Sequence, residues 1–159
     1  MSILRDTIVW DDSLLLGIPL LDEQHKSMVN ISNELFAACI ESPENANSHF
    51  IKSVYNAIAD IHRHFSKEEK LMSMLFYQGT VRHKREHTNF FFNVVKQLRA
   101  HETGKKIVPE QFVYFFKDWL LSHITVSDRV LATHIKEMNR TGKLKQIFET
   151  KQEKALLSA

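Results

Sequence analysis

The sequence predicts an all-α protein, an up-down-up-down antiparallel four-helix bundle with an N-terminal arm and a C-terminal extension. Turn-forming residues are scarce, with 4 Gly and 3 Pro among 159 residues, which favours a few long helices over many short strands. Four long stretches each repeat apolar residues at helical spacing, so each helix would carry one broad apolar stripe. The connections between them are short, and short connections favour antiparallel neighbours.

The N-terminal elements are an arm and a first helix. Residues 1–19 are expected to form an irregular arm that ends at Gly17 and Pro19. A first helix should follow over about residues 20–40, until the segment ESPEN (41–45) interrupts it.

Two further helices are expected in the middle of the chain. The second covers about residues 46–76 and ends at YQGT (77–80). The third covers about residues 81–102 and is followed by the loop TGKKIV (103–108). Both breaks contain a glycine, which is typical of helix ends.

A fourth helix should begin at Pro109, because proline suits the first turn of a helix. Its apolar stripe runs through Phe112, Phe116, Trp119, His123, Val126 and Val130. Gly142 marks a stop, and the Lys-, Glu- and Gln-rich residues 141–159 are expected to form a C-terminal tail, as an additional helix or a frayed extension. Residues 20–140 are therefore predicted to be the bundle domain.

Composition excludes several classes of protein. The net charge is only +2 and no long basic run occurs, so no nucleic-acid partner is expected. The single cysteine, Cys39, excludes an internal disulfide and a cysteine-rich metal site, and it fits a reducing cytoplasm, the expected location. The apolar segment 13–21 is short and broken by Gly17 and Pro19, so we expect neither a signal peptide nor a membrane span.

Histidines lie within the apolar stripes of three helices. His83 and His87 are four residues apart and so lie on one face, which continues through the apolar residues Phe91, Val94 and Leu98. His123 continues the stripe of the fourth helix, and His25 lies on that of the first. One such histidine is more often a core residue with a hydrogen-bond partner than a metal ligand. Four of them favour a shared metal ion, because each unpaired buried polar group costs about 1–3 kcal/mol.

The segment IHRHFSKEEKLM (61–72) adds two candidates. His64 and Glu68 are one helical turn apart and lie on the inward side of the second helix. His62 is about 200° around the helix from His64, and it falls with Glu69 on the polar face. We therefore expect His62 and Glu69 to face solvent. The remaining histidines, His49, His101 and His134, are expected at the surface.

Asp128 is the weakest candidate on spacing alone. It lies five residues after His123, about 140° around an ideal helix. Either the carboxylate reaches sideways, or the helix is widened there by a π-bulge, or Asp128 is a surface residue that pairs with Arg129 or Lys136.

The candidate ligands are His25, His64, Glu68, His83, His87, His123 and Asp128. Seven ligands are too many for one tetrahedral zinc ion, and they offer too few oxygens for calcium. Two six-coordinate ions that share bridging carboxylates would use all of them. Mixed imidazole and carboxylate ligands suit iron, although manganese, cobalt or zinc could bind the same groups.

These stretches resemble the hemerythrin-like family, specifically the single-domain bacteriohemerythrins. The resemblance covers about residues 8–138 and is carried by LGIPLLDEQH (16–25), HFSKEE (64–69), HKREH (83–87) and WLLSHITVSD (119–128). It implies a centre of two iron ions with a bridging oxo or hydroxo group. His83, His87 and His123 would bind one iron, His25 and His64 the other, and Glu68 and Asp128 would bridge them.

The resemblance further implies a protein that binds dioxygen reversibly, for storage, delivery or buffering, rather than an enzyme. Residues beside the ligands are apolar and are expected to line the oxygen pocket: Met28, Phe65, Trp119, Leu120, Ile124 and Leu131. One alternative is a di-iron oxidase or peroxidase, which the absence of any ExxH motif disfavours. Another is an oxygen or redox sensor that acts on a partner, with self-association or partner contact through the tail.

Overall fold

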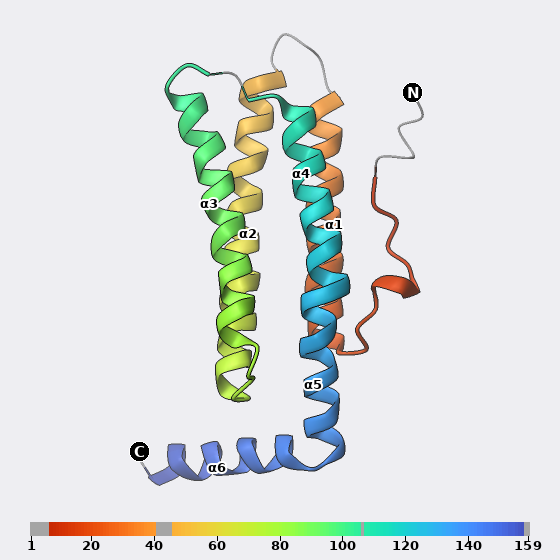
Figure 1. Cartoon of the computed structure of the whole chain (residues 1–159), viewed down its shortest axis with the longest axis vertical. Coiled ribbons are helices and arrows are strands. Elements are labelled where there is room, and N and C mark those ends of the chain that lie inside the picture. The colour runs from red at the N-terminus through yellow and green to blue at the C-terminus, as the bar shows by residue number, and fades with distance from the viewer. Residues whose placement is uncertain (1–6, 41–45, 106, 158–159) are drawn as a thin grey trace.

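The computed structural model describes the backbone of residues 7–40, 46–105 and 107–157. Its main helices lie side by side as a bundle: α1 (Pro19–Ile40), α2 (Ala46–Met74), α3 (Thr80–Glu102) and α4 (Pro109–Ser122) (Figure 1). The fourth helix continues through the π-helix η3 (His123–Asp128) into α5 (Arg129–Arg140). No β-strand occurs in the described ranges, so the predicted all-α helical bundle is confirmed.

The arm runs beside α1 and is held there by hydrogen bonds. The side chain of Asn33 accepts from the Ile8 amide at 2.8 Å and donates to the Ile8 carbonyl oxygen at 2.9 Å. Asp22, in the first turn of α1, accepts from the amides of Leu16 and Gly17. Apart from one 3-10 turn, η2 (Asp12–Leu14), the described part of the arm is irregular, as expected.

Proline and glycine set the ends of the helices as their chemistry predicts. Pro109 occupies the first turn of α4. Gly104, after α3, has a φ of 87°, and Gly142, after α5, has a φ of 74°. This left-handed conformation is the usual end of a helix and costs glycine little, because it has no Cβ.

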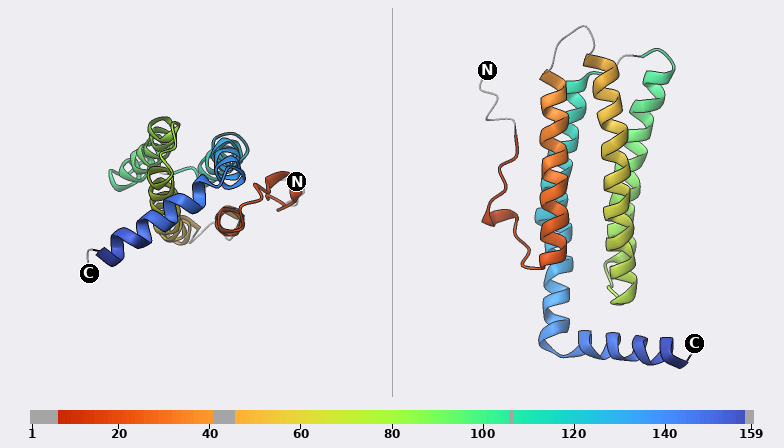
Figure 2. Two further views of the ribbon diagram at one scale, coloured as in Figure 1. Left: turned by 90° about the horizontal axis from the view of Figure 1, so that it is seen from below. Right: turned by 180° about the vertical axis from the view of Figure 1, so that it is seen from behind.

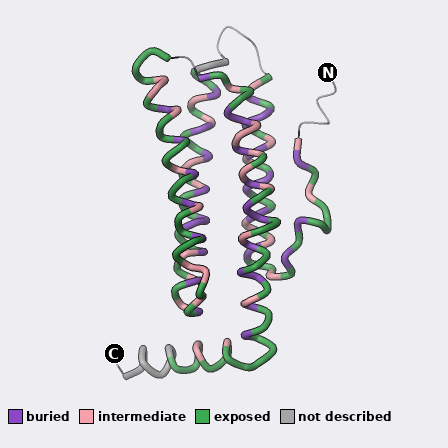
Figure 3. The backbone as a smooth tube through the Cα atoms, viewed as in Figure 1, coloured by how far each residue is buried: buried purple, intermediate pink, exposed green. Residues whose placement is uncertain are grey.

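The core lies between the helices, and buried residues recur along the helices of the bundle (Figure 3). Helix α1 packs against α2 and α4, and α2 packs against α3. The ring of Phe90 on α3 lies 4.3 Å from that of Trp119 and 5.7 Å from that of Phe116, which joins α3 to α4. The predicted stripe of α3 was wrong at one position, because Phe90 is 1% exposed while Phe91 is only half-buried.

The π-helix changes which residues of the fourth helix face inward. The uninterrupted stripe predicted Val126 and Val130 as buried, and this was wrong, because their side chains are 51% and 56% exposed. A π-helix closes its turns with bonds five residues apart instead of four, so the inward face moves by about one residue. After His123 the buried residues are therefore Ile124, Asp128, Leu131, Ala132, Ile135 and Met138.

Helix α6 (Lys143–Leu157) crosses the end of the bundle beneath the turn between α2 and α3 (Figure 2). It packs on α5, with Leu144 and Ile147 half-buried against the core. The tail is thus helical, one of its two expected forms, while the domain boundaries at 19 and 140 stay predictions. No helix among the described residues has the length and apolar character that a membrane crossing requires.

The contact of the arm with α1 can be tested at Asn33. Replacing Asn33 by Ala removes two hydrogen bonds, and we expect a loss of about 1–2 kcal/mol in the free energy of unfolding, measured by urea denaturation. Asn30→Ala, at an exposed position of the same helix, corrects for the higher helix propensity of alanine. Equal stability of the two variants would show that the arm contributes nothing through this contact.

Candidate metal centre

The seven candidate ligands meet in the interior of the bundle. Each is at most 5% exposed, although all are polar. They come from three α-helices and the π-helix: His25 from α1, His64 and Glu68 from α2, His83 and His87 from α3, and His123 and Asp128 from η3. A dry core that gathers this many polar side chains requires a compensating interaction.

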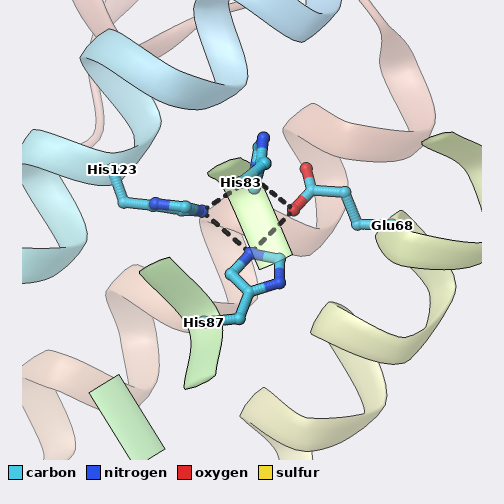
Figure 4. Close-up of side chains that lie close together, drawn as sticks. All are labelled: Glu68, His83, His87 and His123. Atoms are coloured by element: carbon cyan, nitrogen blue, oxygen red, sulfur yellow. Dashed lines mark hydrogen bonds and ion pairs between the residues drawn. The ribbon is translucent and has the colours of Figure 1, made fainter. Parts of the chain in front are cut away.

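The seven residues form two groups that have Glu68 in common. In each group the ligand atoms lie within 4.8 Å of one another. One group is Glu68, His83, His87 and His123, whose donor atoms point toward a shared centre (Figure 4). The other is His25, His64, Glu68 and Asp128.

Asp128 extends across both groups. Its Oδ1 lies 3.0 Å from Nε2 of His83 and 3.2 Å from Nε2 of His123. Its Oδ2 lies 3.0 Å from Nε2 of His25. The two oxygens therefore face different groups, which is the arrangement a bridging carboxylate needs. The π-helix produces it, because it places Asp128 on the same face as His123. Of the three alternatives that the spacing left open, the structure has the widened helix.

Three of the imidazoles have a fixed orientation because Nδ1 meets an acceptor. His64 Nδ1 lies 2.7 Å from Oε1 of Gln24, and His87 Nδ1 lies 3.0 Å from Oε1 of Glu69. His123 Nδ1 lies 3.1 Å from Oε2 of Glu86. These oxygens only accept hydrogen bonds, so Nδ1 must carry the proton. In the neutral ring Nε2 is then left with a lone pair that points into the centre.

Converging lone pairs repel one another unless a cation lies between them. His123 Nε2 is 3.0 Å from Nε2 of both His83 and His87. This separation is close to the edge of an octahedron with metal–ligand bonds of about 2.1 Å. In the group of His25, His64, Glu68 and Asp128, the buried Nδ1 of His25 has no hydrogen-bond partner among the described residues. The donors therefore fit a pair of metal ions.

Comparison with known proteins agrees with this geometry. Residues 16–135 match the family model described as the hemerythrin HHE cation binding domain. The chain belongs to the hemerythrin family. It is 30% identical to a bacteriohemerythrin of Stenotrophomonas maltophilia over 81% of this chain and 82% of that protein. It is 33% identical to a hemerythrin of Sipunculus nudus over 77% of this chain and 89% of that protein.

Buried neighbours set the protonation of the candidate ligands in this member of the hemerythrin family. Burial lowers the pKa of His64 to about 4, which keeps its imidazole neutral. Burial and the neighbouring Asp128 oppose charge on Glu68, but His83 and His87 outweigh them and bring its pKa down to about 2. Burial also opposes charge on His83, yet the carboxylates of Asp128 and Glu68 raise its pKa to about 10. A metal cation would take the place of that proton.

Sequence reasoning missed the residues that hold the imidazoles. Glu69 was expected to face solvent, and this was wrong, because it is half-buried and contacts His87. Gln24 and Glu86 had not been singled out. A signal was present, since Gln24, Glu69 and Glu86 each neighbour a candidate ligand in the sequence. Metal-binding histidines usually donate their second ring nitrogen to an oxygen, so such neighbours are natural partners.

The other histidines are divided between surface and partly buried positions. His62 is exposed, as predicted, and so is His49. His101 and His134 were expected at the surface, but both are half-buried. The ring of His134 lies 5.2 Å from that of Tyr77, which belongs to the loop between α2 and α3. Neither belongs to the two groups of candidate ligands.

Apolar side chains surround the two groups. Of the six residues expected to line an oxygen pocket, Met28, Phe65, Leu120, Ile124 and Leu131 are at most 2% exposed. Trp119 is half-buried. Phe65 stacks on His87 with ring centroids 3.7 Å apart, and Trp119 stacks on His123 at 4.5 Å. The stacked rings keep water from the donors and restrict rotation of the imidazoles.

The two histidines of α2 allow a direct test of the site. Replacing His64 by Ala should lower the metal content of the protein and change its absorption spectrum, because the group that contains His25 and His64 loses a donor. Replacing exposed His62 by Ala should change neither. Metal analysis of both purified variants beside the wild type measures this. A His64→Ala variant with wild-type metal content and spectrum would remove His64 from the site.

Proposed function

We propose that this protein is a non-haem di-iron protein that binds dioxygen reversibly and so stores, delivers or buffers it. The observation that carries the proposal is the pair of buried donor groups that share Glu68. Membership in the hemerythrin family supports the same function. The mixture of imidazole and carboxylate donors suits iron.

The proposed ligands follow the two groups. His83, His87 and His123 would hold one iron, and His25 and His64 would hold the other. Glu68 and Asp128 would be shared between the two ions, together with an oxo or hydroxo group. Support comes from the membership of Glu68 in both groups and from the two oxygens of Asp128, which face different groups. The ion held by His25 and His64 has one protein ligand fewer, so dioxygen would bind at that position.

The protein's own residues serve to orient the donors and to exclude water. When bound, the two iron ions supply the electrons that dioxygen takes up and returns. Gln24, Glu69 and Glu86 fix three imidazoles so that Nε2 points inward. Buried Leu120, Ile124 and Leu131 offer no proton to a bound ligand. A dry surrounding without proton donors favours release of dioxygen unchanged over its reduction.

Part of this proposal is that the protein carries dioxygen and does not act as an enzyme. Turnover of peroxide or of another substrate by the iron-loaded protein would support the alternative of an oxidase or peroxidase. Action as a sensor, and self-association or partner contact through residues 141–159, stay predictions. The exposed part of α6, where Phe148 is 44% exposed, offers a surface for such contact. The cytoplasmic location stays a prediction as well.

Reversible oxygenation tests the proposed function. The protein reduced under anaerobic conditions should gain colour on exposure to oxygen and lose it when oxygen is removed, over repeated cycles. Absorption spectroscopy with a simultaneous iron assay measures this. Irreversible oxidation in the first cycle, with no oxygenated form that can be bleached, would contradict the proposal.

A second test concerns the dryness of the surroundings at Met28. Met28 is 2% exposed and lines a pocket together with His64, so Met28→Gln should admit water there and accelerate oxidation of the oxygenated protein at least several-fold. Met74→Gln provides a matched control, because Met74 is half-buried near the end of α2, six residues beyond Glu68. Equal oxidation rates in the two variants would show that Met28 does not protect the site.

A further inference from the structure

The two groups of candidate ligands differ in the charge of the residues that accept a hydrogen bond from Nδ1 of their histidines. In the three-histidine group, Glu69 accepts from His87 and Glu86 accepts from His123. In the two-histidine group, Gln24 accepts from His64. Nδ1 of His25 has no hydrogen-bond partner in the part of the chain that the structure describes. Two carboxylates thus support one group, and a single neutral amide supports the other.

Both glutamates are fixed in place by further contacts. Oε1 of Glu69 faces His87, while Oε2 lies 3.3 Å from Nζ of Lys84. Oε2 of Glu86 accepts from both His123 and the hydroxyl of Ser127, which belongs to the π-helix. Lys84 and Arg82, the cations beside the two carboxylates, are 48% and 80% exposed, so solvent screens much of their charge. The negative charge next to the imidazoles is therefore only partly offset.

A carboxylate behind an imidazole changes how the ring binds a metal. The N–H at Nδ1 shifts electron density toward Nε2, which becomes a stronger donor, and the negative charge itself lies one ring away from the ion. Both effects stabilise a 3+ ion more than a 2+ ion. An amide acceptor such as Gln24 orients the ring equally well but adds no charge.

We propose that Glu69 and Glu86 are positioning residues that make the three-histidine position the tighter one and the one that favours ferric iron. The neutral Gln24 leaves the two-histidine position weaker. The ion at the two-histidine position keeps an open position for a ligand. Its surroundings then favour ferric iron less than those of the three-histidine position do. This inference rests on the proposed di-iron function, and it concerns residues that act on the ions through His87, His123 and His64.

Glutamine substitutions separate charge from orientation. Glu69→Gln and Glu86→Gln keep an oxygen acceptor for Nδ1 but remove the negative charge. Each should lower the preference for ferric over ferrous iron by about tenfold, which raises the midpoint potential by about 59 mV for one electron. Gln24→Glu should shift the potential in the opposite direction. Glu23→Gln, a neutralised exposed carboxylate on α1, should leave it unchanged.

Potentiometric titration followed by absorption measures these shifts. Potentials of Glu69→Gln and Glu86→Gln that equal that of Glu23→Gln would overturn the inference, because orientation alone would then explain the contacts. A shift of the same sign in Gln24→Glu would overturn it as well.

Loss of iron to a ferrous chelator assigns the effect to one position. The reduced protein should release iron in two phases, the slower from the three-histidine position. Glu86→Gln should accelerate the slow phase about tenfold, whereas Gln24→Leu should accelerate the fast phase. The reverse assignment would refute the inference. A wild-type protein that incorporates no iron would refute the proposed function instead, so the two failures can be told apart.

Discussion

The structure depends on one electrostatic problem, the convergence of buried electron-rich donors at the centre of a small bundle. Nε2 of His123 lies 3.0 Å from Nε2 of both His83 and His87, and the carboxylates of Glu68 and Asp128 lie beside them. Without a cation such a cluster would destabilise the core, since buried polar groups require partners. Four helices nonetheless each contribute at least one donor, and the apolar packing above and below holds the donors together.

The π-helix is where the fold adapts to this cluster. An uninterrupted α-helix would carry His123 inward and turn Asp128 away from it. The wider turn of the π-helix brings both residues inward. It also exposes Val126 and Val130, which an α-helical stripe would have buried. The same element carries Ser127 toward Glu86. One local change of helix geometry thus places a carboxylate, that of Asp128, between the two groups and brings Ser127 to Glu86, the partner of His123.

The surroundings of the donors have two distinct roles. Stacked rings, Phe65 on His87 and Trp119 on His123, restrict the imidazoles and exclude water. Gln24, Glu69 and Glu86 each accept a hydrogen bond from Nδ1 of an imidazole and so fix the orientation of that ring. Packing therefore controls access to the site, whereas hydrogen bonds control the direction and strength of each donor. The unequal charge of these partners distinguishes the two groups of candidate ligands, beyond the number of histidines in each.

The sequence by itself determined the all-α class, the helix ends at Pro109 and Gly142, and the selection of His64 over His62, because these follow from local chemistry and helical phase. Helical phase alone left Asp128 ambiguous. Tertiary structure decided the π-helix, since a widened turn is favoured only when side chains from other helices require it. It also decided the partners Glu69 and Glu86, because a hydrogen bond between two helices depends on how they pack and is absent from the periodicity of either one.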